Sequence, residues 1–97
     1  MVNDAKYLSA VTSMQLFNDK ELAMASAACK ICRDAAAAEG KKDIQAEMIA
    51  MHGEVVKEMV KRMVKRDGTA PDGLTLEQAI ARIESETLTD LKELEAA

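Results

Sequence analysis

The sequence predicts an all-α fold, an antiparallel bundle of three to four helices without a β-sheet. Three observations support this fold class: apolar residues recur at helical spacing, glycines divide the chain into helix-length blocks, and only one proline is present. Aromatic residues make up 2% of the chain, so Ala, Met, Val, Ile and Leu must fill the core, which suits close-packed helices. Because 97 residues have room for one core, we expect a single helical domain over residues 1–97.

The first helical block covers about residues 4–38 and is ambiguous at its centre. Asn18 followed by Glu21 is able to cap a new helix, whereas the apolar residues keep one helical phase through Asn18. The sequence is therefore compatible with two helices, about 4–17 and 19–38, or with one kinked helix. We favour a break or kink at Asn18.

The second half of this block is rich in small apolar residues. They cover more than about half of the helical wheel and comprise Met24, Ala25, Ala27, Ala28, Ile31, Ala35 and Ala36. Because small side chains let helix axes approach closely, we expect this segment to form an interface between helices. The sequence leaves open whether that interface lies within the chain or across a dimer.

The second helix is predicted over about residues 43–66, and its apolar residues are spread widely. They occupy roughly 220° of the circumference, more than one surface helix needs, so this helix must have neighbours on two sides. From this arc we selected a candidate interaction surface, which consists of Met48, Met51, Val55, Met59 and Met63. Because methionine is a flexible side chain that fills cores, we first expect these methionines to lie in the core. A surface that binds a partner protein is the second interpretation.

The last helix is predicted over about residues 76–95, after a loop at 67–74. Thr75 followed by Gln78 fits a capping box, which sets the start of this helix. Its apolar residues form a narrow stripe, which indicates packing on one side only. Glycines also follow both earlier helices where C-terminal caps belong, at Gly40 and Gly68.

Positive charge is concentrated near the end of the second helix, in Lys57, Lys61, Arg62, Lys65 and Arg66. Such a run is able to contact phosphates, which makes nucleic-acid binding one alternative function. However, cations are favoured at a helix C-terminus, and residues 67–97 carry eight acidic against two basic side chains. Because the chain turns back there, we expect an internal charge match and not a nucleic-acid partner.

A soft-metal site is the other alternative function. Cys29 and Cys32 have the spacing of thiols that hold a metal or form a redox pair, and His52 lies among methionines, which favour Cu(I). A Cu(I) or Zn(II) site would use both cysteines and His52, with Met48 or Met51. However, the cysteines lie inside a helix, a zinc site needs four ligands, and buried structural thiols are more common. We expect no metal site and a hydrogen-bonded structural role for His52.

Other functional signals point away from catalysis. The sequence has no phosphate-binding glycine loop, nucleophile elbow or HExxH motif, so we expect neither an enzyme nor a bound cofactor. It shows no signal peptide and no apolar run of membrane-spanning length, so we expect a cytoplasmic protein without a membrane partner. The expected function is that of an adaptor, inhibitor or assembly subunit, which binds an unidentified protein through apolar helix faces and forms a homodimer.

Overall fold

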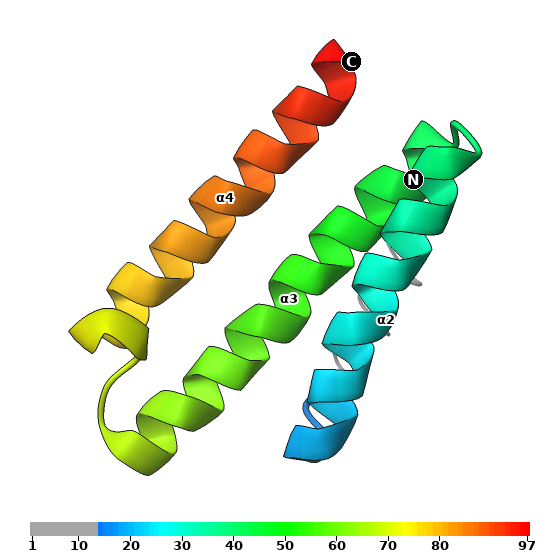
Figure 1. Cartoon of the computed structure of the whole chain (residues 1–97). Helices are drawn as coiled ribbons and strands as arrows, with labels where there is room; N and C mark the ends of the chain where they lie inside the picture. The colour runs from blue at the N-terminus through cyan, green and yellow to red at the C-terminus, as the bar shows by residue number, and fades with distance from the viewer. Residues whose placement is uncertain (1–13) are drawn as a thin grey trace.

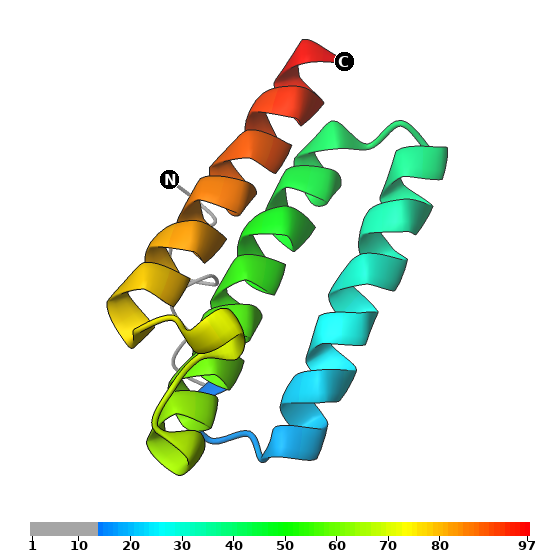
Figure 2. The same ribbon diagram turned by 60° about the vertical axis from the view of Figure 1, so that its left-hand side comes forward.

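The computed structural model describes residues 14–97, which form three α-helices arranged side by side (Figure 1). These are α2 at Asp19–Ala38, α3 at Lys42–Asp67 and α4 at Leu76–Ala96. α3 lies in the middle, and α2 and α4 run antiparallel to it on either side (Figures 1 and 2). The all-α fold class is confirmed, and the described residues contain no strand.

The chain before α2 contains the break that the sequence left open. Met14 is helical, residues 15–18 are not, and Asn18 has an extended backbone with φ −77° and ψ 173°. The Asn18 side chain accepts a hydrogen bond from the Glu21 amide at 2.8 Å, and the Glu21 carboxylate accepts one from the Asn18 amide at 2.9 Å. This reciprocal capping box starts α2. The helix expected at 4–17 lies mostly outside the described residues, and its described part ends at Met14.

Left-handed glycines end both α2 and α3, as expected. Gly40 has a φ of 71°, and its amide donates to the Ala37 carbonyl at 3.1 Å. The Lys41 amide donates to the Ala36 carbonyl at 2.9 Å. This pair of bonds is a Schellman motif, which satisfies the last carbonyls of α2 while the chain reverses. Gly68, with a φ of 87°, closes α3 in the same left-handed conformation.

The connection between α3 and α4 is the expected loop, and it contributes to the core. It contains one short 3-10 turn, η1 at Pro71–Gly73. Ala70, just before this turn, is 3% exposed, and its amide donates to the Leu74 carbonyl at 3.0 Å. The Thr75 hydroxyl accepts a hydrogen bond from the Gln78 amide at 3.2 Å, which confirms the predicted capping box at the start of α4.

The core consists of two clusters, one on each side of α3. The first lies between α2 and α3, with Leu22 and Val55 at its centre, each 1% exposed. The second lies between α3 and α4 and contains Val60 and Ala79. The expectation that α3 has neighbours on two sides is therefore confirmed. Its wide apolar arc reflects two interfaces within one chain.

α3 and α4 approach each other closely at Gly53, a buried residue in the middle of α3. A Cβ atom at this position would lie 2.7 Å from Oγ1 of Thr87 on α4, closer than real Cβ contacts allow. Glycine costs a helix interior about 1 kcal/mol relative to alanine. Helix propensity alone disfavours glycine at position 53. The close packing of α3 against Thr87 of α4 therefore explains why glycine is present there.

We expect Gly53→Ala to destabilise the protein by about 1–3 kcal/mol, because overpacking against Thr87 exceeds the gain in helix propensity. Thr87→Ala removes the two nearest atoms, Oγ1 and Cγ2, so Gly53→Ala should cost much less in the Thr87→Ala background. Chemical denaturation of the wild type, both single variants and the double variant measures this coupling. Strictly additive effects would contradict the close contact.

Candidate interaction surface and the groove at His52

α2 has one buried side and one exposed apolar side. Leu22, Cys29 and Ala36 are buried on the side that faces α3. By contrast, Met24 and Ile31 are 64% and 69% exposed. Together with small exposed residues they form what we call the outer face of α2, which comprises Met24, Ala27, Ala28, Ile31 and Ala35. In Figure 2, α3 lies between α2 and α4, although an ion pair between Arg33 and Asp90 also joins these two helices directly.

The composition of α2 explains why the helix forms although half of it is uncovered. Eight of its 20 residues are alanine, the strongest helix former, so its backbone needs little support from packing. Met24 and Ile31 contribute less to the fold than buried residues of their size do. Burying such a side chain stabilises a protein by about 1.5–3 kcal/mol, and these two side chains remain mostly exposed. The outer face of α2 therefore carries two large apolar side chains that its own chain leaves exposed, which makes it a candidate interaction surface.

The surface predicted on α3 lies mostly inside the chain. Val55 is 1% exposed and belongs to the core, which corrects its assignment to a surface. The other four residues are half-buried: Met48, Met51, Met59 and Met63. Two of them, Met51 and Met59, pack against the core cluster that contains Leu22. The residues that cover these methionines belong to α2 and to the segment before it. A helical wheel of α3 alone does not show residues from other segments.

A groove of about 190 Å³ is lined by all three helices, and His52 is one of the α3 residues in it. His52 Nε2 lies 3.1 Å from Ser26 Oγ of α2, which places a hydrogen bond across the α2–α3 interface. Arg33 of α2 and Asp90 of α4 form an ion pair with a separation of 3.7 Å between Nη1 and Oδ2. Two further charged residues line the groove, Lys30 and Glu86. His52 is thus hydrogen-bonded inside the bundle, as expected.

The candidate soft-metal ligands are divided between two places. The groove is lined by Cys29, Met48 and His52. Cys32 and Met51 do not line it; both border an apolar cavity of about 300 Å³ between α2 and α3, which shares Cys29 and Met48 with the groove. Burial, together with the nearby Cys32, raises the pKa of the Cys29 thiol and disfavours the thiolate that a metal requires. Among residues 14–97, no group of three or more His, Cys, Asp or Glu is placed to hold a metal ion.

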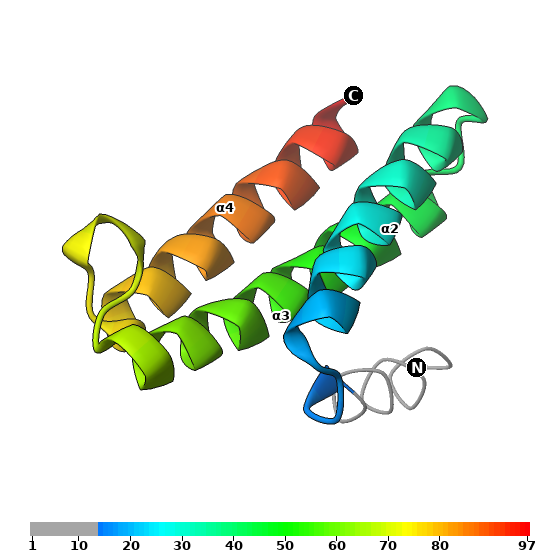
Figure 3. The ribbon, with the colours of Figure 1, turned by 60° about the horizontal axis from the view of Figure 1, so that its bottom comes forward.

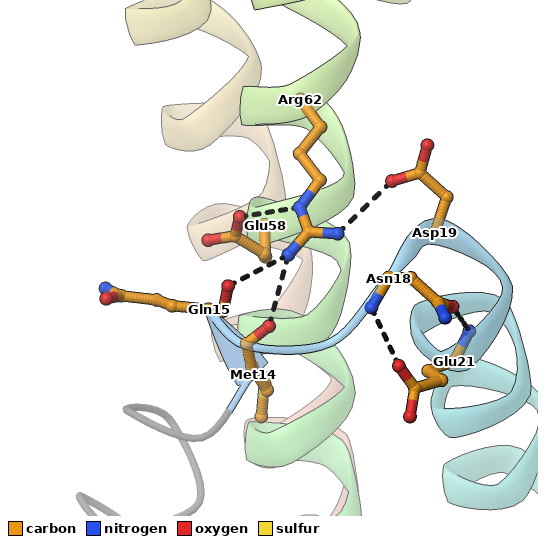
Figure 4. Close-up of polar contacts among 7 residues, drawn as sticks. All are labelled: Met14, Gln15, Asn18, Asp19, Glu21, Glu58 and Arg62. Carbon is orange, nitrogen blue, oxygen red and sulfur yellow. Dashed lines mark hydrogen bonds and ion pairs between the residues drawn. The ribbon is translucent and has the colours of Figure 1, made fainter.

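Arg62, which belongs to the predicted basic patch, fastens the segment before α2 to α3 (Figure 4). Its Nε donates to Glu58 at 3.0 Å, and its Nη1 donates to Asp19 of α2 at 3.2 Å. Its Nη2 donates to the backbone carbonyls of Met14 and Gln15, each at 3.3 Å. The planar guanidinium therefore joins four acceptors, a geometry that lysine does not provide.

The rest of the predicted patch is partly neutralised within the chain. Lys57 Nζ lies 3.2 Å from carboxylate oxygens of both Glu54 and Glu84, the second of which belongs to α4. Arg66 pairs with its neighbour Asp67 at 3.0 Å. The remaining two, Lys61 and Lys65, are exposed. The expected charge match with α4 is thus present at Lys57, whereas the partner of Arg62 on another helix lies on α2 (Figure 4).

The apolar residues of α2 divide into two stripes, which the width of the apolar arc on a helical wheel does not separate. Leu22, Cys29 and Ala36 follow a seven-residue spacing and turn toward α3. The outer stripe follows its own alternation of four and three residues, at Met24, Ala28, Ile31 and Ala35. This second periodicity is visible in the sequence and is the signal that identifies the outer face.

In comparisons with known proteins, no family model, curated protein or solved structure matches the chain. The candidate surface therefore rests on its own geometry. In the part of the chain that the structure describes, no helix has both the length and the apolar character needed to cross a membrane.

The environment of His52 predicts a pH-dependent stability. Burial and the positive charges of Lys30 and Arg33 lower the pKa of His52 below its ordinary value of 6.5, and Asp90 opposes this shift. The unfolded chain therefore takes up a proton before the folded chain does, and His52 reduces the free energy of unfolding as the pH falls below 6.5.

We expect the wild type to lose more stability between pH 7.5 and pH 5 than His52→Gln, in which the side chain does not titrate. Denaturant unfolding of both proteins at both pH values measures the difference. The carboxylates of the groove are present in the wild type and in the variant, so they do not account for a difference between the two. An identical loss in the two proteins would contradict the assigned environment of His52.

Proposed function

We propose that this protein is a non-enzymatic interaction protein, which binds a partner protein through the outer face of α2. The observation that carries the proposal is the exposure of Met24 and Ile31 on a continuous apolar stripe. An adaptor, an inhibitor or an assembly subunit would each use such a surface, and a cytoplasmic setting is the corresponding prediction.

The chemistry of the outer face favours a helix as the partner's binding element. Its alanines let a second helix axis approach closely, and its two large side chains provide knobs that fit between the partner's residues. Methionine adds adaptability, because its unbranched side chain fits differently shaped partners. A partner that presents an apolar helical stripe therefore matches the face.

The two alternative functions gain less support from the described contacts. Soft-metal binding would need Cys32 and His52 together, yet they line different cavities. Nucleic-acid binding would need a cluster of free cations, yet three of the five patch residues, Lys57, Arg62 and Arg66, pair with carboxylates of the same chain. We therefore propose protein binding alone.

Substitution of Ile31 tests the proposal. We expect Ile31→Glu to weaken partner binding at least about tenfold, because it buries a carboxylate in place of an apolar side chain. Leu88→Glu is the matched control, since Leu88 is a comparably exposed apolar residue, 53% exposed, on α4.

The measurement is affinity capture from the native host with the wild type and both variants as bait, followed by identification and titration of the bound proteins. Proteins lost with Ile31→Glu and retained with Leu88→Glu are the expected result. Equal capture by all three baits would contradict the proposed surface. Circular dichroism of each bait verifies that the helices are intact.

A further inference from the structure

We propose that the residues before Met14, about 4–13, form a helix that docks into the apolar cavity between α2 and α3. The occupant of this cavity is then a segment of the same chain. Three observations support this arrangement: the chemistry of the cavity walls, the place where the described chain meets the cavity, and the length over which apolar residues recur before α2.

The cavity offers its occupant an almost wholly apolar surface. It has a volume of about 300 Å³, and its walls come from residues 25–32 of α2 and residues 48–55 of α3. None of the described residues that line it is charged, and α4 contributes none of them. Cys32 lies at one end and is exposed, so the cavity opens to the surface of the bundle. An apolar helix face would remove this surface from water, which is favourable.

The described chain meets the cavity at the end opposite Cys32. Met14 and Phe17 both line it, and Met14, which is 4% exposed, packs with Val55 in the core. Arg62 donates to the Met14 carbonyl at 3.3 Å and so fixes this point of the chain against α3 (Figure 4). Met14 itself is helical. The segment before it is therefore attached at the cavity and needs no linker to reach it.

The apolar pattern before α2 has the length of the cavity. From Met48 to Val55 on α3, the cavity covers seven positions, or about two helical turns. Tyr7, Val11 and Met14 cover the same seven positions, at the spacing of four and three that keeps residues on one helix face. Because every α-helix rises equally per residue, a helix that runs parallel to α3 up to Met14 places Tyr7 level with Met48.

The opposite side of the proposed helix is polar, as an exposed helix side requires. On a helical wheel, Lys6, Ser9 and Ser13 lie opposite Val11. A helix this short is marginal in water without tertiary contacts, so it depends on a neighbour for its apolar side. The cavity provides that neighbour, and the docked helix turns Val11 inward and Ser9 outward.

Docking in the cavity does not compete with the proposed function. Of the outer face of α2, only Ala28 also lines the cavity. Met24 and Ile31 lie outside it and remain available to a partner protein. The two proposals therefore use different surfaces of α2, and each is tested with substitutions that leave the other surface intact.

Cysteine cross-linking in the full chain tests the docking and its register. Tyr7→Cys places a thiol at the Cys32 end of the cavity, whereas Ser9→Cys, the matched control, places one on the polar side. We expect oxidised glutathione to join positions 7 and 32 within one chain at least about tenfold faster than positions 9 and 32, because docking raises the effective concentration of the first pair. Peptide mapping by mass spectrometry identifies each bond.

Equal rates of cross-linking in the two variants would overturn the inference, because an undocked segment brings both positions to Cys32 equally often. A bond between two chains would also overturn it, since a second copy would then supply the helix in the cavity.

Aspartate substitutions test the apolar contact independently. We expect Val11→Asp to lower the urea concentration at the midpoint of unfolding by about 1 M, because the charge would face the apolar walls of the cavity. Ser9→Asp adds the same charge on the polar side and should leave the midpoint nearly unchanged. Urea unfolding followed by circular dichroism gives both midpoints. Equal midpoints for the two variants would show that Val11 does not face the cavity and would overturn the inference.

Discussion

The fold depends on one constraint, the need of α3 to cover two apolar faces at once. α2 covers the face that contains Val55, and α4 covers the face that contains Gly53 and Val60. Each outer helix packs mainly on α3 (Figure 3), and the Arg33–Asp90 ion pair joins the two outer helices directly. α3 therefore has a neighbouring helix on two sides, whereas each outer helix packs mainly on one.

The same arrangement creates the two features that bear on function. Because α2 and α4 both pack on α3, a groove remains along α3 where the Arg33–Asp90 ion pair links the outer helices and His52 bonds Ser26. Its lining contains apolar as well as charged side chains, and several of its ionisable groups, Arg33, Glu86 and Asp90, form ion pairs within the chain. The outer face of α2 differs, since it is apolar, exposed and unpaired in one chain. We therefore propose a binding role for the outer face of α2 and a structural role for the groove.

The basic residues of α3 illustrate how packing changes the meaning of a charge cluster. In the sequence, Arg62 belongs to a cationic run, but in the structure it holds Asp19 and two backbone carbonyls of the chain before α2. Lys57 joins α3 to α4 through Glu84. Two residues of this run of like charges, Lys57 and Arg62, thus contact different neighbouring helices and stabilise the arrangement of the helices.

The sequence by itself determined the helices and most of their limits, but it left open whether the chain breaks at Asn18. The capping box at Thr75 and the left-handed glycines at positions 40 and 68 act through hydrogen bonds between residues a few positions apart, so local sequence reveals them. It also determined that α3 needs two neighbours, because the width of an apolar arc is a property of one helix.

Only the tertiary structure decided which apolar residues are covered. Val55 is in the core and Ile31 is exposed, although both belong to broad apolar arcs in the sequence. The partners of Arg62 likewise come from a segment more than 40 positions away. Burial and ion pairing at these sites depend on residues that other helices bring near, and the periodicity of a single helix carries no information about them.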